Sequence, residues 1–383
     1  MIKILTIIGA RPQIIKAAAL SRAIRNAFSD QIQEVILHTG QHYDENMSKV
    51  FFNELQIPAP DYNLNVGSGT HGVQTAQMME GIESVLLTEN PACVVMYGDT
   101  NSTLAGAVAA AKLHIPVVHI EAGLRSFNKS MPEEINRIVC DHCSTLLFSP
   151  TRAGFNNLVK EGFNPENSAP FTPDHPGIFH CGDVMYDNTL FFAEIACSQA
   201  KILENLNLGS GQYLLVTLHR PANTDDTENL EAIFRALTGI SLSHNKAIVL
   251  PMHPRTAKMI QQLPDSELKK AISQNENFRI IPPVSFLEMT QLEENAHMIL
   301  TDSGGVQKEA YFFKKPCIIL RNETEWVEIV ENGCATLAGA NEARITEAYR
   351  HFLINPPVSY PHIFGNGMAA EFICGEIAKN FAG

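Results

Sequence analysis

Short apolar runs rich in valine and isoleucine alternate along the chain with longer stretches of helical periodicity. Such short, continuous apolar runs are typical of strands in a parallel sheet that helices cover on both faces. The predicted strands form two series. The first is Ile2–Ile8, Val35–His38, Cys93–Tyr97, Val117–Ile120 and Leu146–Phe148, and the second is Leu214–Leu218, Ile248–Leu250, Arg279–Ile281, Met298–Leu300 and Cys317–Leu320.

The segment Asn164–Pro176 separates the two series. It contains four prolines and little periodicity, which favours an interdomain linker. The chain of 383 residues is also long enough for two domains, since a domain usually takes about 100–200 residues. We therefore expect an α/β fold of two Rossmann-like, doubly wound domains that face a cleft, at residues 1–170 and 177–365.

Charge and composition narrow the class of partner. Acidic residues outnumber basic ones 41 to 28, and no block of lysine and arginine offsets this, so we expect no nucleic-acid partner. No apolar run approaches the roughly 20 residues that span a bilayer, and Met1–Ile8 is too short for a signal peptide, so we expect a cytoplasmic protein without membrane contact. The scattered cysteines and carboxylates lack a chelating spacing, and we predict no metal site.

Charged and small residues follow many of the predicted strands. In open α/β sheets, ligands lie beyond the carboxyl ends of the strands, so these residues predict a binding site. They are Gly9–Pro12, Gly98–Asn101, Glu121–Arg125, His219, Arg220, Asp302–Gly305 and Arg321.

Two glycine-rich segments differ in what they predict. Ser303, Gly304 and Gly305 follow a strand and precede a helical run, where free N–H groups and the helix dipole favour a diphosphate, although a plain glycine turn is the structural alternative. Gly67–Gly72 satisfies G-x-G-x-x-G but follows no convincing strand and lacks the later acidic residue. We therefore predict a phosphate site at the first segment and no nicotinamide cofactor at the second.

Carboxylates at strand ends are candidates for acid–base chemistry. Asp99, Glu121 and the pair Glu133–Glu134 could converge, although Asp99 could equally cap a helix and the glutamate pair could stabilise a helix start. We expect His119, inside a strand, to be a satisfied core histidine. His219, at a strand end, is the better phosphate ligand or proton donor.

Seven ordered motifs resemble those of the bacterial non-hydrolysing UDP-N-acetylglucosamine 2-epimerases, and together they cover nearly the whole chain. They are Gly9–Pro12 with Lys16, Gly98–Thr103, His119–Arg125, Pro132–Arg137, Thr217–Arg220, Thr301–Glu309 and Thr324–Glu325.

The resemblance implies a GT-B arrangement in which a C-terminal helix, residues 366–383, packs back onto the first domain. It implies interconversion of UDP-N-acetylglucosamine and UDP-N-acetylmannosamine through UDP elimination, without a cofactor, and we expect a homodimer with a UDP-sugar as its substrate. By motif position, the implied catalytic residues are Asp99, Glu121, Glu133 and His219. The implied substrate ligands are Arg11, Lys16, Arg137, His219, Met289, Ser303, Gly304, Gly305, Glu309 and Arg321.

The chain also departs from the family pattern. Trp326 and Val327 replace the Arg-Pro of a Thr-Glu-Arg-Pro-Glu motif, and Gln41–Asp44 lacks an arginine that helps some relatives bind an activating UDP-N-acetylglucosamine. We therefore expect hyperbolic kinetics without such an activator. Tyr43 and Trp326, with Leu218–Arg220, resemble the branch that includes UDP-2,3-diacetamido-2,3-dideoxyglucuronate 2-epimerases, which gives an alternative substrate. A GT-B glycosyltransferase, a hydrolysing epimerase and a non-catalytic nucleotide-sugar sensor are further alternatives.

Overall fold

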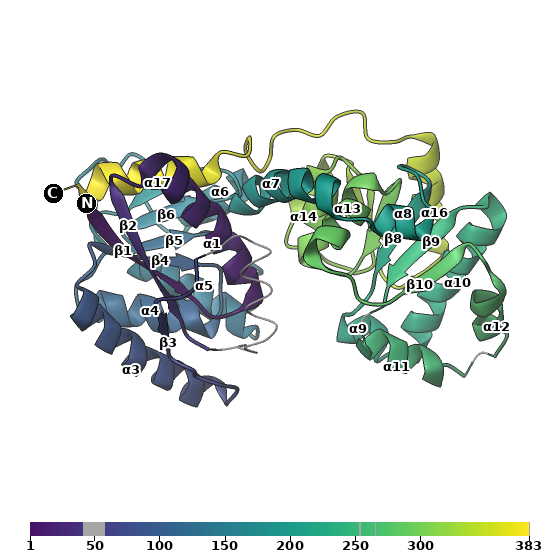
Figure 1. Ribbon diagram of the computed structural model, residues 1–383, viewed down its shortest axis with the longest axis horizontal. Helices are drawn as coiled ribbons and strands as arrows, with labels where there is room; N and C mark the ends of the chain where they lie inside the picture. Colours follow the sequence, from purple (N-terminus) through teal and green to yellow (C-terminus); the bar gives the residue numbers. More distant parts are fainter. Residues whose placement is uncertain (41–57, 253, 265, 383) are drawn as a thin grey trace. The chain divides into compact units, whose positions relative to one another are not determined.

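A computed structural model describes residues 1–40, 58–252, 254–264 and 266–382 of the protein. The chain divides into two compact units (Figure 1). Unit 1 comprises Met1–Asn188 and His362–Gly383, and unit 2 comprises Thr189–Pro361. The Gln41–Asp44 segment discussed above lies outside the described residues.

Unit 1 is built on a parallel sheet with the strand order β3-β2-β1-β4-β5-β6-β7. The strands are β1 (Ile2–Ile8), β2 (Ile32–His38), β3 (Tyr62–Asn63), β4 (Cys93–Tyr97), β5 (Val117–Ile120), β6 (Leu146–Ser149) and β7 (Gly177–His180). The helices are α1 (Arg11–Ala23), η1 (Ile24–Phe28), α3 (His71–Glu89), α4 (Asn101–Lys112), α5 (Pro132–Cys143), α6 (Arg152–Lys160), the first part of α7 (Val184–Gln199) and α17 (Ala369–Phe381). Strands β4, β5 and β6 are buried along their whole length, as expected for a sheet covered on both faces.

Unit 2 repeats this topology in the order β10-β9-β8-β11-β12-β13. Its strands are β8 (Tyr213–Thr217), β9 (Ala247–Pro251), β10 (Phe278–Ile281), β11 (Met298–Thr301), β12 (Cys317–Ile319) and β13 (Ala335–Leu337). Its helices, after the end of α7, are α8 (Ile202–Leu206), α9 (Pro221–Thr224), α10 (Thr227–His244), α11 (Pro254–Gln262), α12 (Ser266–Gln274), α13 (Phe286–Asn295), α14 (Gly304–Phe312), α15 (Val327–Glu331) and α16 (Glu342–Ile354).

Both sheets therefore have the doubly wound order, and the predicted class of two Rossmann-like α/β domains is confirmed. In each sheet the order reverses at one point, between β1 and β4 in unit 1 and between β8 and β11 in unit 2. A crevice opens beyond the carboxyl ends of the strands at such a switch point, and ligands of doubly wound folds bind there.

The boundary between the units differs from the expected one at residues 170–177. After Asn164–Pro176 the chain adds β7, which pairs in parallel with β6, so this proline-rich segment is a loop inside unit 1. The ring of Phe179 in β7 stacks on that of Phe148 in β6, with 5.2 Å between the ring centroids. Because β7 completes the sheet, unit 1 continues to Asn188.

The C-terminal residues return to unit 1 after the last helix of unit 2. Helix α17 packs on α1 (Figure 1). The ring of Phe372 in α17 meets the rings of Phe148 and Phe179 edge-on, at 6.3 and 6.0 Å. Asp187 accepts hydrogen bonds from the backbone amides of Ala369 and Ala370 and so holds the start of this helix.

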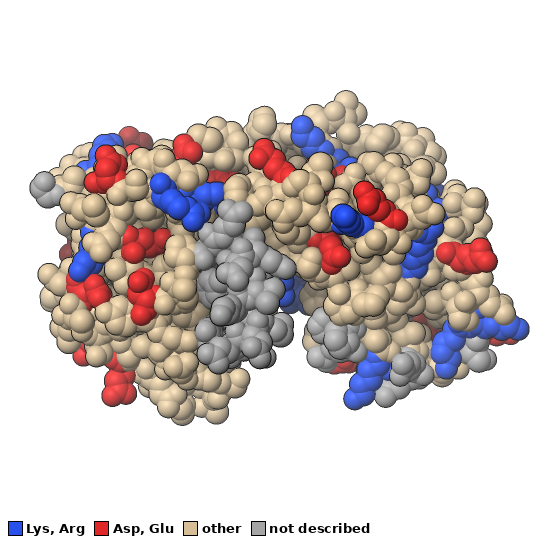
Figure 2. All heavy atoms as spheres, in the orientation of Figure 1, with Lys and Arg blue, Asp and Glu red and all other residues tan. Residues whose placement is uncertain are grey.

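The surface and the helices give two further observations. Acidic and basic side chains are interspersed over the face shown in Figure 2. Among the described residues, no helix combines the length and the apolar character needed to cross a bilayer.

Candidate functional site

Three neighbouring strands of unit 1 end in the predicted site residues. Because β1, β4 and β5 are adjacent, Arg11, Asp99 and Glu121 all lie at one edge of the sheet. Between them, Gly98 has a φ of +62°, and a Cβ atom there would lie 3.1 Å from Lys16 Nζ and 3.3 Å from Glu121 Oε2. The strand end thus needs glycine both for its conformation and for the close approach of these two side chains.

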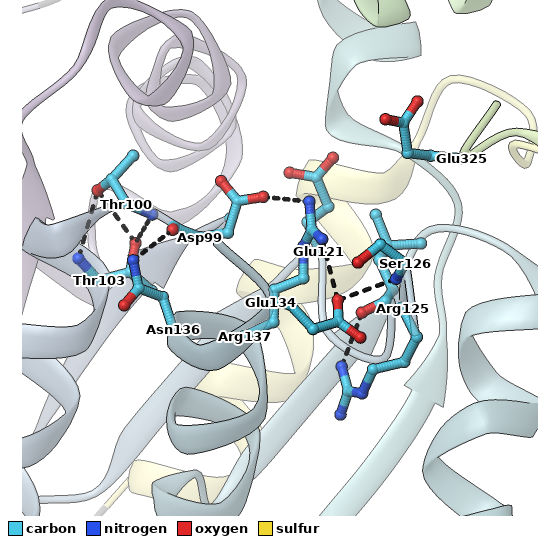
Figure 3. A network of polar contacts seen from close by, with 12 residues as sticks. Asp99, Thr100, Thr103, Glu121, Arg125, Ser126, Glu134, Asn136, Arg137 and Glu325 are labelled. Atoms are coloured by element: carbon cyan, nitrogen blue, oxygen red, sulfur yellow. Dashed lines mark hydrogen bonds and ion pairs between the residues drawn. The ribbon is translucent and has the colours of Figure 1, made fainter. Parts of the chain in front are cut away.

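Two carboxylates at this edge are each paired with a cation. Arg137 of α5 pairs with Asp99, and Lys16 of α1 pairs with Glu121. The four side chains are between 12% and 27% exposed, so they are accessible yet shielded from bulk water. Figure 3 shows the Arg137 guanidinium between the carboxylates of Asp99 and Glu134.

Amide side chains fix the backbone that carries these groups. The Oε1 atom of Gln13 accepts hydrogen bonds from the amides of Gly9 and Ala10, and its Nε2 atom donates to the carbonyl of Tyr97. Asn136 of α5 donates to the Asp99 carbonyl at 2.8 Å. Neither Gln13 nor Asn136 is among the predicted site residues, although Asn136 lies inside the Pro132–Arg137 motif.

Of the two adjacent glutamates at the start of α5, Glu134 is the buried one. Its carboxylate accepts hydrogen bonds from the amides of Ser126 and Phe127, at 2.9 Å each, and contacts Arg137 at 3.3 Å. Burial raises the pKa of Glu134, but these hydrogen bonds and the charge of Arg137 outweigh it, and the pKa lies below its usual value. Glu133, the predicted catalytic residue, is exposed in the first turn of α5.

Glu121 has an unusual backbone conformation, with a φ of +77°. Positive φ is uncommon for residues other than glycine, and such strained residues cluster at functional sites. Glu121, which the resemblance implies to be catalytic, thus has a backbone conformation of the kind found at functional sites.

The corresponding edge of unit 2 is organised around Asp302. This fully buried carboxylate follows β11 and accepts hydrogen bonds from the amides of His219 and Arg220, which follow β8. It also accepts a hydrogen bond from the side-chain amide of Asn223. The same amide group donates a second hydrogen bond to the carbonyl oxygen of Leu320, at the end of β12. Asp302 thus ties the end of β8 to that of β11, and Asn223 extends this link to the end of β12. The His219 ring lies 3.4 Å from the carboxylate and is 40% exposed.

The start of α14 is open around its two glycines. Ser303 is the N-cap residue, and its hydroxyl faces the Val306 amide at 3.5 Å. A Cβ atom on Gly304 or Gly305 would meet nothing closer than 3.6 Å, and neither residue has a positive φ. The fold itself therefore does not require glycine at these positions, whereas close approach of an anion to the backbone amides would.

The segment after β12 closes one side of this helix start. Arg321 makes a two-pronged ion pair with Glu325, at 3.0 and 3.1 Å. The indole of Trp326 donates to the carbonyl of Gly304 at 3.0 Å, and the ammonium of the buried Lys308 lies 4.2 Å from the indole ring centroid. Trp326, a departure from the family pattern, is thus a structural neighbour of the glycines.

Glu309 and Met289 lie on neighbouring helices of unit 2. Glu309, on α14, is partly buried and hydrogen-bonds with Glu293 of α13. Burial, together with the charge of Glu309 and this hydrogen bond, raises the pKa of Glu293 well above its usual value, so Glu293 is the proton donor of the pair. Met289 is a partly buried residue of α13.

The structure therefore brings several of the predicted residues together within each unit, while no side-chain hydrogen bond or ion pair among the described residues links Glu133 or Met289 to them. In unit 1, Asp99, Glu121, Lys16 and Arg137 form the two ion pairs, and Arg11 lies exposed at the start of α1. In unit 2, His219, Ser303–Gly305 and Arg321 lie at the ends of the adjacent strands β8, β11 and β12.

Comparison with known proteins gives matches over almost the full length. The sequence profile of the UDP-N-acetylglucosamine 2-epimerase family matches residues 25–378. A UDP-N-acetylglucosamine 2-epimerase homolog of Methanococcus maripaludis is 49% identical over 380 residues, 99% of both chains. The UDP-2,3-diacetamido-2,3-dideoxy-D-glucuronate 2-epimerase of Pseudomonas aeruginosa is 48% identical, over 98% of this chain and 99% of its own.

Solved structures match as well. The crystal structure of the UDP-GlcNAc 2-epimerase of Methanocaldococcus jannaschii, in complex with UDP-GlcNAc and UDP, is 43% identical with a TM-score of 0.81, covering 99% of this chain and 100% of its own. The resemblance to bacterial enzymes in particular is not confirmed, because the matches include archaeal proteins. Fold, motifs and full-length matches agree, and the chain belongs to the UDP-N-acetylglucosamine 2-epimerase family.

Proposed function

We propose that this protein interconverts UDP-N-acetylglucosamine and UDP-N-acetylmannosamine without net hydrolysis. The observation that carries the proposal is the pair of carboxylates, Asp99 and Glu121, at adjacent strand ends, each paired with a cation. Two such groups suit acid–base chemistry on a sugar carbon. Family membership and the UDP-GlcNAc bound in the related structure support the choice of substrate.

The chemistry at C2 of the sugar favours an elimination. C2 bears the acetamido nitrogen and adjoins the acetal carbon C1, and no carbonyl carbon is attached to it that could stabilise a carbanion. When a base removes the C2 proton, the C2–H electron pair forms a C1=C2 double bond, and the C1–O bond breaks so that UDP leaves with its electron pair. UDP then adds back to this 2-acetamidoglycal while C2 takes a proton on the opposite face.

The two units supply different parts of this reaction in our proposal. Asp99 and Glu121 of unit 1 handle the proton, and Glu133 is the third carboxylate by motif position. His219 and the amides at the start of α14 in unit 2, with Arg11, stabilise the charge on the departing diphosphate. Donors aimed at a developing charge are usually a large part of catalysis. Arg321, Met289 and Glu309 hold the nucleotide, with Glu309 accepting from the ribose hydroxyls.

The test is to incubate the protein with UDP-N-acetylglucosamine alone and follow the sugars by NMR. We expect UDP-N-acetylmannosamine without an acceptor and without UDP accumulating. Asp99→Asn and Glu121→Gln should each slow turnover by about 10²-fold or more while retaining UDP binding. Equal amounts of UDP and free N-acetylmannosamine would indicate a hydrolysing enzyme instead, and reaction only with an added acceptor would indicate a glycosyltransferase.

One relative gives a second candidate substrate. The Pseudomonas aeruginosa 2-epimerase for UDP-2,3-diacetamido-2,3-dideoxy-D-glucuronate is as similar to this chain as the archaeal homolog, at 48% against 49% identity. The ratio of kcat/KM for the two UDP-sugars decides between them. A higher value for the diacetamido sugar would replace our first choice while leaving the elimination mechanism in place.

A further inference from the structure

A fully buried aspartate in unit 1, Asp141 of α5, links three parts of the chain. Its Oδ1 atom lies 2.6 Å from Nδ1 of His119 in β5. Its Oδ2 atom accepts hydrogen bonds from the Arg125 guanidinium at 2.7 Å and from the Gly123 amide at 3.1 Å. The side chains of Asp141 and His119 are fully buried and that of Arg125 is 1% exposed, so this is an interior network.

His119 faces an acceptor at each of its ring nitrogens. Besides the Asp141 contact, its Nε2 atom lies 2.8 Å from the carbonyl oxygen of Gly98, which can only accept. A neutral imidazole has one N–H group, so a ring that donates at both nitrogens is an imidazolium. The two donors on Oδ2, one of them the cationic guanidinium of Arg125, favour the carboxylate form of Asp141.

The groups around the ring agree with this protonation state. Burial lowers the pKa of His119, but the neighbouring Cys140 and Asp141 outweigh it, and the pKa is raised well above its usual value. Burial likewise raises the pKa of Asp141, but His119 and Arg125 outweigh it, and the pKa is lowered. Beyond Arg125 the network continues to Glu161, which Arg125 meets at 2.6 and 2.7 Å.

The network holds the backbone on both sides of the two reacting carboxylates. His119 and Gly123, both bound to Asp141, flank Glu121, whose φ of +77° needs such restraint. Through the second ring nitrogen, His119 also holds the carbonyl of Gly98, the residue before Asp99. Asp141 itself lies one turn along α5 from Arg137, the partner of Asp99.

We propose that Asp141 and His119 form a permanently charged positioning pair that sets the separation of Asp99 and Glu121. The inference rests on the function proposed above. A buried ion pair contributes little net stability compared with apolar packing, so a role in positioning explains its cost better than a role in folding. Because its nitrogens are both engaged and buried, His119 carries no proton to or from the substrate.

The first measurement reads the protonation state without using activity. In protein labelled with ¹⁵N-histidine, we expect the His119 ring, assigned by its loss in His119→Gln, to show two protonated nitrogens with no titration between pH 6 and 9. A neutral ring within this range would overturn the assignment of a charged pair.

The second measurement compares Asp141→Asn with Asp187→Asn. Both substitutions replace a buried aspartate of unit 1. Asp141 accepts hydrogen bonds from the Gly123 amide and the Arg125 guanidinium, near the strand ends, whereas Asp187 accepts them from two backbone amides at the start of α17. A misplacement of about 1 Å at reacting groups costs about 10²-fold, so we expect Asp141→Asn to lower kcat by roughly that factor with KM and UDP affinity changed less than about twofold. Asp187→Asn should keep kcat.

The possible failures are distinguishable. If the wild-type chain turns over no UDP-sugar, the proposed function fails. If the wild-type chain is active and Asp141→Asn keeps its kcat, or loses it no more than Asp187→Asn does, the positioning role is wrong. If Asp141→Asn does not fold, the ¹⁵N measurement on the wild-type protein and the kcat of Arg125→Lys, expected to fall with KM unchanged, decide the matter.

Discussion

At the scale of single residues, a proposed role can depend on a partner that lies outside the sequence motifs. Glu309 is an example, because the neighbouring Glu293 is a buried acid that donates a hydrogen bond to it. That bond restrains the Glu309 carboxylate on α14. A ribose diol is the complementary donor, which agrees with the nucleotide role that we propose for Glu309.

Replacing Glu309 by alanine should therefore weaken UDP itself. A hydrogen bond to a charged group contributes roughly 1.5–3 kcal/mol, so we expect about a tenfold or greater loss of UDP affinity by calorimetry. Glu331→Ala, at an exposed position at the end of α15 in the same unit, is the control and should bind UDP as the wild type does. Equal affinities in both variants would place the ribose elsewhere.

A second residue gives a prediction about pH. His38 at the end of β2 is fully buried, its Nδ1 atom accepts a hydrogen bond from the Gly40 amide, and burial lowers its pKa to about 4. In the unfolded chain the pKa is about 6.5. The folded state therefore binds this proton less readily than the unfolded state does. As the pH falls from about 6.5 to 4, the contribution of His38 to the free energy of unfolding is lost, and the full loss is about 3 kcal/mol.

Urea unfolding of His38→Gln at pH 7 and pH 4.5 tests this prediction. The variant should lose less stability between the two pH values than the wild type does, while the exposed His175→Gln should match the wild type. Other groups titrate in this range, among them Asp187, whose pKa burial raises to about 6. They are common to all three proteins, so an unchanged pH dependence in His38→Gln would contradict the account.

At the scale of elements, the turn after β5 shows how closely the backbone is packed at the site edge. Gly123 has a φ of +79°, and a Cβ atom there would lie 2.3 Å from the carbonyl oxygen of Gly154 at the start of α6. Gly162 also has a positive φ, of +100°, but a Cβ atom there would meet nothing within 4 Å. A side chain at Gly162 would therefore meet backbone strain alone, whereas a side chain at Gly123 would meet both backbone strain and a steric clash.

Alanine at the two positions should destabilise unit 1 to different extents. Gly162→Ala pays for backbone strain alone, about 1–2 kcal/mol. Gly123→Ala adds overpacking against rigid backbone, typically another 1–3 kcal/mol. Urea unfolding should thus give the larger loss for Gly123→Ala. Equal losses would show that the β5–α6 contact is looser than described.

The elements also show what the sequence could predict. All ten predicted strands are present, because strands buried on both faces are continuous apolar runs. The strands β3, β7 and β13 were missed, since each is only two to four residues long at or near a sheet edge and β7 follows four prolines. The expected domain boundary at residues 170–177 also rested on composition, and a proline-rich loop inside a domain has the same composition as a linker between domains.

The site was predictable in outline, because residues after parallel strands meet at one edge of the sheet. What the sequence could not supply is which of two adjacent carboxylates turns inward. Glu133 and Glu134 differ only by their angle on α5, and the structure buries Glu134. The sequence also could not show which groups bind His119, since Gly98 and Asp141 lie 21 and 22 residues from it in the chain.

At the scale of the whole molecule, the same doubly wound topology occurs twice with different chemistry at the strand ends. Unit 1 presents carboxylates held by lysine and arginine, and unit 2 presents a helix start with two unobstructed glycines beside histidine and arginine. The first set suits proton transfer at a carbon, and the second suits a diphosphate. Both kinds of chemistry are needed for the elimination that we propose, in which UDP leaves and adds back.

The most direct test of this account is turnover in D2O. The elimination removes the C2 proton to a side chain that exchanges with solvent, and the re-addition takes a proton from such a side chain. We therefore predict that UDP-N-acetylmannosamine formed in D2O carries deuterium at C2, as read by NMR and mass spectrometry, and that the label appears at least 10²-fold more slowly with Asp99→Asn. Epimerised product without solvent deuterium at C2 would contradict the elimination and require a route in which the C2 hydrogen is kept.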